Sequence, residues 1–140
     1  TSASFNAPQG ITTDGTNLYV TDSGNHLVRQ IVISTGVVTT LAGTGSAGSA
    51  NGTGTSASFS SPHGITTDGT NLYVADYGNN LIRKIVISTG VVTTLAGTGS
   101  WGSANGTGTS ASFYQPDGIV TDKTNLYVVD NANNLIRKIE

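Results

Sequence analysis

The chain has 140 residues, of which 10% are charged, a formal net charge of −2 and no cysteine. This charge balance argues against nucleic-acid binding, which needs basic patches to neutralise phosphates, and the lack of cysteine excludes a disulfide framework and thiolate metal ligands. No apolar run approaches the roughly 20 residues that span a bilayer, so neither nucleic acid nor membrane is expected as a partner.

The sequence repeats itself almost letter for letter. The string TSASF begins at Thr1, Thr55 and Thr109, which defines a repeat of 54 residues. Residues 1–54 and 55–108 differ at only nine positions, and a third, incomplete copy covers residues 109–140. This near-identity indicates recent duplication or design, and the fixed period predicts one supersecondary unit per copy. A chain that begins at Thr1 without methionine is expected to be a processed or trimmed form.

Each full copy predicts four short strands. In the first copy we expect them at residues 10–13, 18–21, 27–33 and 37–41, separated by turns rich in Gly, Asn and Asp. A connection rich in Gly, Ser, Ala and Thr then leads from residue 42 to the next copy. Repeated sets of four antiparallel strands predict an all-β protein made of β-propeller blades. The third copy supplies three strands and lacks the outer one, which gives eleven strands in a single propeller fragment.

One segment of the repeat is familiar. PQGITTDGTNLYVTDSGNHLVRQI, which starts at Pro8, closely resembles the NHL repeat, and Asn25, His26 and Leu27 spell its name. The segments P-x-G-[IV], D-x-x-N-L-Y-V and D-x-x-N-x-L-[IV]-R recur in all three copies. The resemblance implies a propeller of six blades, in a family of protein- and RNA-binding modules, adhesion domains and a few lyases or hydrolases. No catalytic arrangement can be identified in the sequence, so we expect a non-enzymatic recognition or structural module. The alternative is a channel-mouth lyase or hydrolase that uses His63 and Asp117, with or without a metal.

The differences between copies gather on one predicted face. Seven of the nine differences fall in the connection before the first strand of a blade or around the turn after its second strand, and both of these loops should lie on the same face. The opposite face should carry the turns at Gly15, Gly69 and Lys123. Binding usually resides in loops carried by a rigid scaffold, and aromatic residues favour interfaces, although drift on exposed loops remains an alternative reading. The binding-face candidates are Gln9, His63, Asp117, Ser23, Tyr77, Asn131, Tyr114 and Trp101.

Catalytic and metal chemistry is weakly indicated. His63 and Asp117 occupy equivalent positions in adjacent copies near the predicted channel mouth, but a metal site needs more ligands, so we expect neither a metal nor another cofactor. His26 should be solvated. The repeated carboxylates are expected to lock their own Asx-type turns, and the repeated arginines to pair or pack between blades. These residues are Asp22, Asp76, Asp130, Arg29, Arg83 and Arg137.

Three blades cannot close a ring, which leads to a prediction of assembly. Open flanks would expose apolar sheet faces, so we expect a homodimer of half-propellers that completes a six-bladed ring. A further partner, an unknown protein or small ligand, would bind the variable face. The localisation is unknown, with an extracellular or cell-surface parent protein favoured. Six leucine and isoleucine side chains should be mostly buried between strands or blades, namely Leu18, Leu72, Leu126, Ile31, Ile85 and Ile139.

Overall fold

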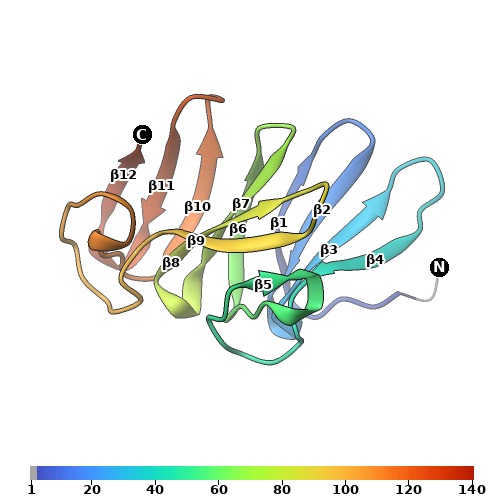
Figure 1. Ribbon diagram of the computed structural model, residues 1–140, viewed down its shortest axis with the longest axis horizontal. Helices are drawn as coiled ribbons and strands as arrows, with labels where there is room; N and C mark the ends of the chain where they lie inside the picture. Colours follow the sequence, from blue (N-terminus) through green and yellow to red (C-terminus); the bar gives the residue numbers. More distant parts are fainter. Residues whose placement is uncertain (1–2) are drawn as a thin grey trace.

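The computed structural model describes residues 3–140, which form three antiparallel sheets arranged side by side (Figure 1). The first sheet has the order β1-β2-β3-β4 and contains β1 (Pro8–Thr13), β2 (Asn17–Asp22), β3 (Leu27–Val32) and β4 (Val38–Ala42). The second has the order β5-β9-β8-β7-β6 and contains β5 (Gly52–Thr53), β6 (Pro62–Thr67), β7 (Asn71–Asp76), β8 (Leu81–Val86) and β9 (Val91–Ala96). The third has the order β10-β11-β12 and contains β10 (Pro116–Thr121), β11 (Leu126–Asp130) and β12 (Leu135–Ile139).

The only helices in the described part of the chain are five single 3-10 turns. Three of them follow the second strand of a sheet, and two lie in the long connections. They are η1 (Ser23–Asn25), η2 (Gly54–Ser56), η3 (Tyr77–Asn79), η4 (Gly108–Ser110) and η5 (Asn131–Asn133). The expectation of an all-β protein built from repeated antiparallel sheets is therefore confirmed.

One strand was missed by the sequence analysis. The connection that we expected to be irregular contains β5, which pairs antiparallel with β9 through Gly52 to Val92 and Thr53 to Val91. The middle sheet consequently has five strands, and β9 lies inside it rather than at its outer edge. The expectation that the fourth strand is outermost is therefore wrong for this sheet. A two-residue strand of glycine and threonine carries no hydrophobic alternation, so no sequence pattern marks it.

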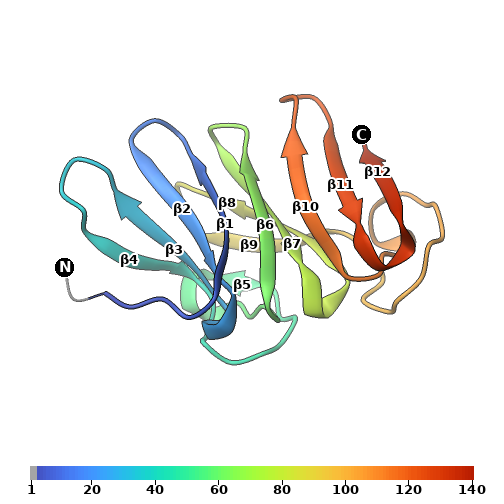
Figure 2. The ribbon, with the colours of Figure 1, turned by 180° about the vertical axis from the view of Figure 1, so that it is seen from behind.

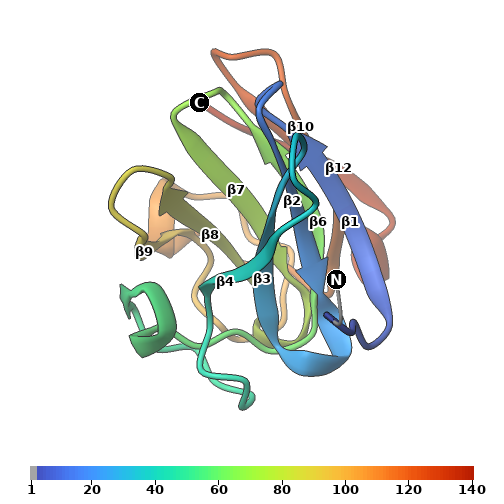
Figure 3. The same ribbon diagram turned by 90° about the vertical axis from the view of Figure 1, so that its right-hand side faces the viewer.

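The first strands of the three sheets lie next to one another. In Figure 2 they stand side by side as β1, β6 and β10, and Figure 3 shows the same stack from the side. The backbones come so close that a Cβ atom on Gly10 or Gly64 would collide with the carbonyl oxygen of the neighbouring strand, at His63 or Asp117 respectively. The glycine of the P-x-G motif is thus required by blade stacking, because only hydrogen fits between the strands.

We predict that Gly64→Ala lowers the free energy of unfolding by about 1–3 kcal/mol, because the added methyl group meets backbone that cannot swing away. Gly118→Ala is the matched control at the equivalent position of the third sheet. The nearest atom there is the Val129 side chain, 3.2 Å away, which can adjust. Urea denaturation of both variants measures the difference, and equal losses would show that the close approach of β6 and β10 is not the cause.

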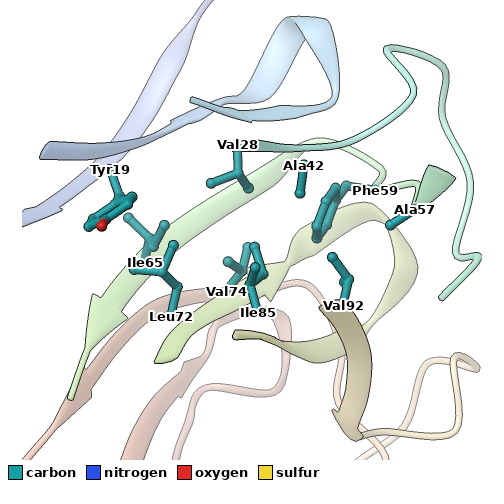
Figure 4. Close-up of a cluster of buried hydrophobic side chains, with 10 residues drawn as sticks. All are labelled: Tyr19, Val28, Ala42, Ala57, Phe59, Ile65, Leu72, Val74, Ile85 and Val92. Carbon is teal, nitrogen blue, oxygen red and sulfur yellow. The ribbon is translucent and has the colours of Figure 1, made fainter. Parts of the chain in front are cut away.

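The core lies between sheets (Figure 4). Side chains from the first sheet, such as Tyr19 and Val28, face the second sheet, where Leu72 and Ile85 are fully buried. A second buried cluster around Ile82 joins the second and third sheets. The burial expected from the sequence holds in the middle sheet, and Leu126 of the third sheet is also buried. Burial is incomplete at Leu18, Ile31 and Ile139, each in an outer sheet.

The turns after the first strands are fixed by an aspartate in each copy. Asp68 Oδ1 accepts hydrogen bonds from the backbone N–H groups of Thr70 (2.8 Å) and Asn71 (2.7 Å), and Tyr73 donates its hydroxyl proton to Oδ2 (2.8 Å). Burial by itself raises the pKa of Asp68, but a hydrogen bond from the side-chain amide of Asn71 (3.0 Å) together with these three outweighs it and lowers the pKa to about 2. The equivalent hydrogen bonds lower the pKa of Asp14 and Asp122 to about 2 as well.

These lowered pKa values predict how stability depends on pH. A carboxylate whose pKa is lower in the folded than in the unfolded chain stabilises the fold above its unfolded pKa, and this contribution is lost as the pH falls towards 2. Asp68→Asn keeps an acceptor for the turn but cannot titrate. It should therefore flatten the loss of stability between about pH 4 and pH 2. Urea midpoints across this range for the single, double and triple Asn variants should flatten stepwise, and unchanged profiles would contradict the assignment.

Candidate functional site

Three of the variable residues come together where the innermost strands begin. His63 and Asp117 each follow the proline that opens β6 and β10, and His63 Nδ1 lies 3.1 Å from Asp117 Oδ1, a distance at which the ring N–H donates to the carboxylate. Tyr77 opens η3, and its ring stacks on the imidazole of His63 with centroids 4.0 Å apart and planes inclined by 12°. The His63 side chain is 20% exposed and that of Asp117 46%, so this cluster is accessible from solvent.

A second aromatic pair comes from the long connection. Trp101 is 74% exposed, and its ring lies 5.8 Å from that of Tyr114, which is 37% exposed. Gln9 and Asn131 are exposed. Ser23 differs from these candidates because only 5% of it is exposed, so it cannot contact a large partner. The short serine side chain remains within η1, whereas Tyr77 at the equivalent position reaches the ring of His63.

His26 does not behave as expected. Its backbone is left-handed, with φ of 57°, and its Nδ1 accepts a hydrogen bond of 3.0 Å from the backbone N–H of Ser61 in the next copy. Asn80 takes the same place one repeat later, where its Oδ1 accepts from the N–H of Gln115 at 2.9 Å. His26 is thus half-buried rather than fully solvated, and one of its ring nitrogens holds the next copy in place. A histidine ring nitrogen and an asparagine oxygen are both acceptors, which explains why the two residues exchange at this position.

The repeated aspartates and arginines form a structural network rather than a reactive site. Asp76 is fully buried and accepts hydrogen bonds from the backbone N–H of Ser60 (2.8 Å), the side-chain amide of Asn79 (2.8 Å) and Arg83 (2.9 Å). It does not cap η3 with its side chain, so the expected Asx-type lock of its own turn is wrong. The true Asx turns are those at Asp14, Asp68 and Asp122. Burial raises the pKa of Asp76, and the hydrogen bonds partly offset this increase.

Arg83 completes this network. It is fully buried and donates further hydrogen bonds to the carbonyl oxygens of Ser58 and Ala50 and to the side-chain oxygen of Asn51. Its guanidinium also lies 5.2 Å from the centre of the Phe59 ring. The arginine therefore ties the sheet to the connection that precedes it, and the same arrangement recurs at Arg137. Pairing was expected, but it occurs within one copy rather than between blades.

The chemistry available to the variable cluster is limited. Asp117 can orient the imidazole of His63, and the other ring nitrogen, Nε2, has no hydrogen-bond partner among residues 3–140. Such a ring can exchange a proton or bind a polar ligand group. Within the described residues, no three His, Cys, Asp or Glu side chains are grouped closely enough to hold a metal ion. The hydrogen bond between His63 and Asp117 and the stack of Tyr77 on His63 each join residues of different elements. In the sequence, the only sign that His63 and Asp117 lie close together was that they hold equivalent places in adjacent copies.

Repeated antiparallel sheets, stacked through their first strands, define this protein as a part of a β-propeller. The NHL repeat matches residues 5–31 and 59–85, and the chain belongs to the NHL-repeat β-propellers. None of the helices in residues 3–140 is long and apolar enough to cross a membrane.

The similar proteins are much longer than this chain. The chloroplastic Protein SUPPRESSOR OF QUENCHING 1 of Arabidopsis thaliana is 32% identical over 99% of this chain, which spans 14% of that protein. NHL repeat-containing protein 2 of Gallus gallus is 36% identical over 68% of this chain and 13% of its own length. Among solved structures, an auxiliary nutrient binding protein from Bacteroides ovatus is 26% identical, with a TM-score of 0.79 over 90% of this chain and 35% of its own.

Proposed function

We propose that the chain is a non-enzymatic recognition module and that two copies assemble into a closed six-bladed ring. Recognition would use the variable cluster of His63, Tyr77 and Asp117. The observation that carries the recognition role is that these residues, each different from its counterparts in the other copies, gather into one accessible group. The observation that carries the assembly is the exposure of apolar side chains on both outer sheets.

The β1 flank is the face of the first sheet that turns away from the second, formed by Ile11, Val20 and Ile31. Ile11 is 62% exposed, whereas its counterpart Ile65 in the middle sheet is 6% exposed because the first sheet covers it. Exposed apolar patches of this kind mark interfaces in soluble proteins. The β1 flank therefore has the composition of a surface that another blade covers.

The β12 flank is the opposite end of the stack, formed by Val120, Val129 and Ile136. Ile136 is 71% exposed, whereas its counterpart Ile82 is fully buried against the third sheet. The third copy also carries valine at residues 120 and 129, where the first copy carries threonine. This flank is thus more apolar than its counterparts inside the stack, which favours its burial in an assembly.

The two flanks match one another. The first sheet packs on the second, and the second packs on the third. In each of these two contacts, the earlier sheet contributes the surface that is equivalent to the β12 flank, and the later sheet contributes the surface that is equivalent to the β1 flank. Two chains could repeat this contact twice around a two-fold axis, and three blades from each would give the six that are usual for NHL propellers. The ring would carry His63 and Asp117 twice.

Light scattering at micromolar concentration tests the ring. We expect the mass of two chains for the unmodified protein, and the mass of one chain for Ile11→Asp and for Ile136→Asp, because each places a charge at the apolar contact. Trp101→Ala, which introduces the residue of the first copy, is the control and should leave the mass unchanged. A folded species with the mass of one chain, or a larger ring, would contradict the dimer.

Nuclear magnetic resonance tests recognition. Amide shifts of the labelled protein are recorded against a fragment library and short peptides. We expect ligands to shift the signals of His63, Tyr77 and Asp117, and the variant His63→Gln with Tyr77→Ser to lose the response. Both replacements are the residues of the first copy, so the fold should tolerate them. Shifts confined to other surfaces would refute the site.

A channel-mouth lyase or hydrolase is the second candidate, because Asp117 orients His63 as it would in a proton-transfer site. Mass spectrometry of the native protein, under conditions that preserve metal binding, tests for the metal-dependent form of this enzyme. A stoichiometric metal that is lost with His63→Gln would favour the enzyme, while ligand binding without bound metal or turnover would favour recognition.

A further inference from the structure

One carboxylate of this chain has no part in holding the fold together. The sequence contains eight aspartates and glutamates, and the side chain of Asp117 has His63 as its only partner within residues 3–140. Each of the other seven fixes a turn or pairs with an arginine or a lysine. They are Asp14, Asp68 and Asp122 in turns, and Asp22, Asp76, Asp130 and Glu140 in ion pairs.

The strands do not require a charge at this position. Asp117 is the second residue of β10, and the second residues of β1 and β6 are Gln9 and His63. Three different side chains thus occupy one backbone position. The two lysines without an ion pair in the described part of the chain, Lys84 and Lys123, line a pocket near the opposite ends of β6 and β10. The carboxylate of Asp117 is 46% exposed and therefore available to a ligand.

The imidazole of His63 is held in one orientation from two sides. Its Nδ1 donates to Asp117 Oδ1 at 3.1 Å, and the ring of Tyr77 stacks on it at 4.0 Å. With the proton on Nδ1, the other nitrogen of the neutral ring, Nε2, is a hydrogen-bond acceptor. The second carboxylate oxygen, Oδ2 of Asp117, is an acceptor as well. The site therefore offers two acceptors and a net negative charge.

We propose that this site binds an organic cation that carries N–H groups, namely a primary ammonium or a guanidinium. The inference rests on the proposed recognition role of His63, Tyr77 and Asp117, and it adds the chemical class of the ligand. One N–H of the cation would donate to Asp117 Oδ2 in a charge-assisted hydrogen bond, and another would donate to His63 Nε2. Because the stack and the hydrogen bond fix the imidazole before binding, little ordering cost is added.

Amide shifts of the labelled protein, recorded at low salt and at about pH 8 to keep the imidazole neutral, test the ligand class. The probes are butylammonium and butylguanidinium. Tetramethylammonium carries the charge without an N–H, butanol carries a donor without the charge, and butyrate carries the opposite charge. We expect both probes to shift the signals of His63 and Asp117 and to bind at least about five-fold more tightly than each of the three controls.

The repeat supplies the variants for this experiment. Asp117→Gln and His63→Gln each introduce the residue of the first copy, so the fold should tolerate both. Asp117→Gln removes the charge and should weaken butylammonium binding at least roughly ten-fold. His63→Gln keeps the carboxylate and supplies an amide oxygen as acceptor, so its effect should be smaller. Asp68→Asn removes a carboxylate at the other end of β6 and should leave binding unchanged.

Two amino-acid derivatives distinguish the sources of such a cation. The amides of N-acetyl-lysine and N-acetyl-arginine carry the same ammonium and guanidinium groups on a peptide backbone. Tighter binding of these amides than of butylammonium and butylguanidinium would assign the site to side chains of a protein. Equal or weaker binding of the amides would assign it to free amines.

The results that contradict the ligand class differ from those that contradict the recognition role. If fragments or peptides shift the signals of His63, Tyr77 and Asp117 but butylammonium does not, or if tetramethylammonium, butanol or butyrate binds as well as butylammonium, the cation is wrong and the recognition site stands. Unchanged butylammonium binding by Asp117→Gln would also overturn the cation. If every ligand shifts only other surfaces, the recognition site itself is wrong.

Discussion

Arg83→Ala is expected to lower the free energy of unfolding by about 3–5 kcal/mol, because it leaves the Asp76 carboxylate buried without its partner. Both side chains of the pair are fully buried, and their closest atoms lie 2.9 Å apart. The substitution also frees the carbonyl oxygens of Ser58 and Ala50, which accept from the guanidinium. A loss of this size is a large share of the stability of a small domain, so urea denaturation should show a clear shift of the midpoint.

Two further variants show whether the pair is the cause. Arg29→Ala removes the equivalent arginine of the first sheet, whose side chain is 14% exposed and whose contact to Ser4 O is long at 3.4 Å, so its loss should be smaller. In the double variant Asp76→Ala with Arg83→Ala, the charge without a partner is gone, and the total loss should fall well below the sum of the single losses. Additive losses would show that the two residues act independently.

Leu72→Ala is expected to cost about 2–5 kcal/mol, the range for truncating a buried leucine in a packed core. Leu72 is fully buried, with 0% of its surface accessible to solvent, and lies in the cluster between the first and second sheets. The cavity left by the truncation would be lined by rigid strands on both sides, which limits collapse.

The repeat supplies the control for this experiment as well. Leu18 occupies the equivalent position in the first sheet and is only partly buried in the single chain. Leu18→Ala should therefore cost less than Leu72→Ala in a protein kept as single chains by Ile136→Asp. Chemical denaturation that gives less than about 0.5 kcal/mol for Leu72→Ala would place that side chain at the surface.

The sequence by itself determined the all-β class, the repeated blade and the family. A period of 54 residues, together with four short segments and regular turns, leaves few other arrangements. It also located the main strands to within a few residues, because segments rich in β-branched residues are separated by turns of Gly, Asn and Asp. The burial of Leu72 and Ile85 followed from the same alternation.

Only the tertiary structure decided the features that depend on contacts between distant residues. The strand β5 exists because β9 presents an edge to it, and its own glycine and threonine carry no strand signal. The role of His26 depends on the backbone N–H of Ser61 in the next copy, and the burial of Asp76 depends on Arg83 and on the segment before β6. The hydrogen bond between His63 and Asp117 forms because adjacent blades bring β6 and β10 into backbone contact, and the stack of Tyr77 on His63 depends on the contact of η3 with β6. The repeat placed residues 63 and 117 near one another, but no sequence pattern encodes the hydrogen bond or the stack.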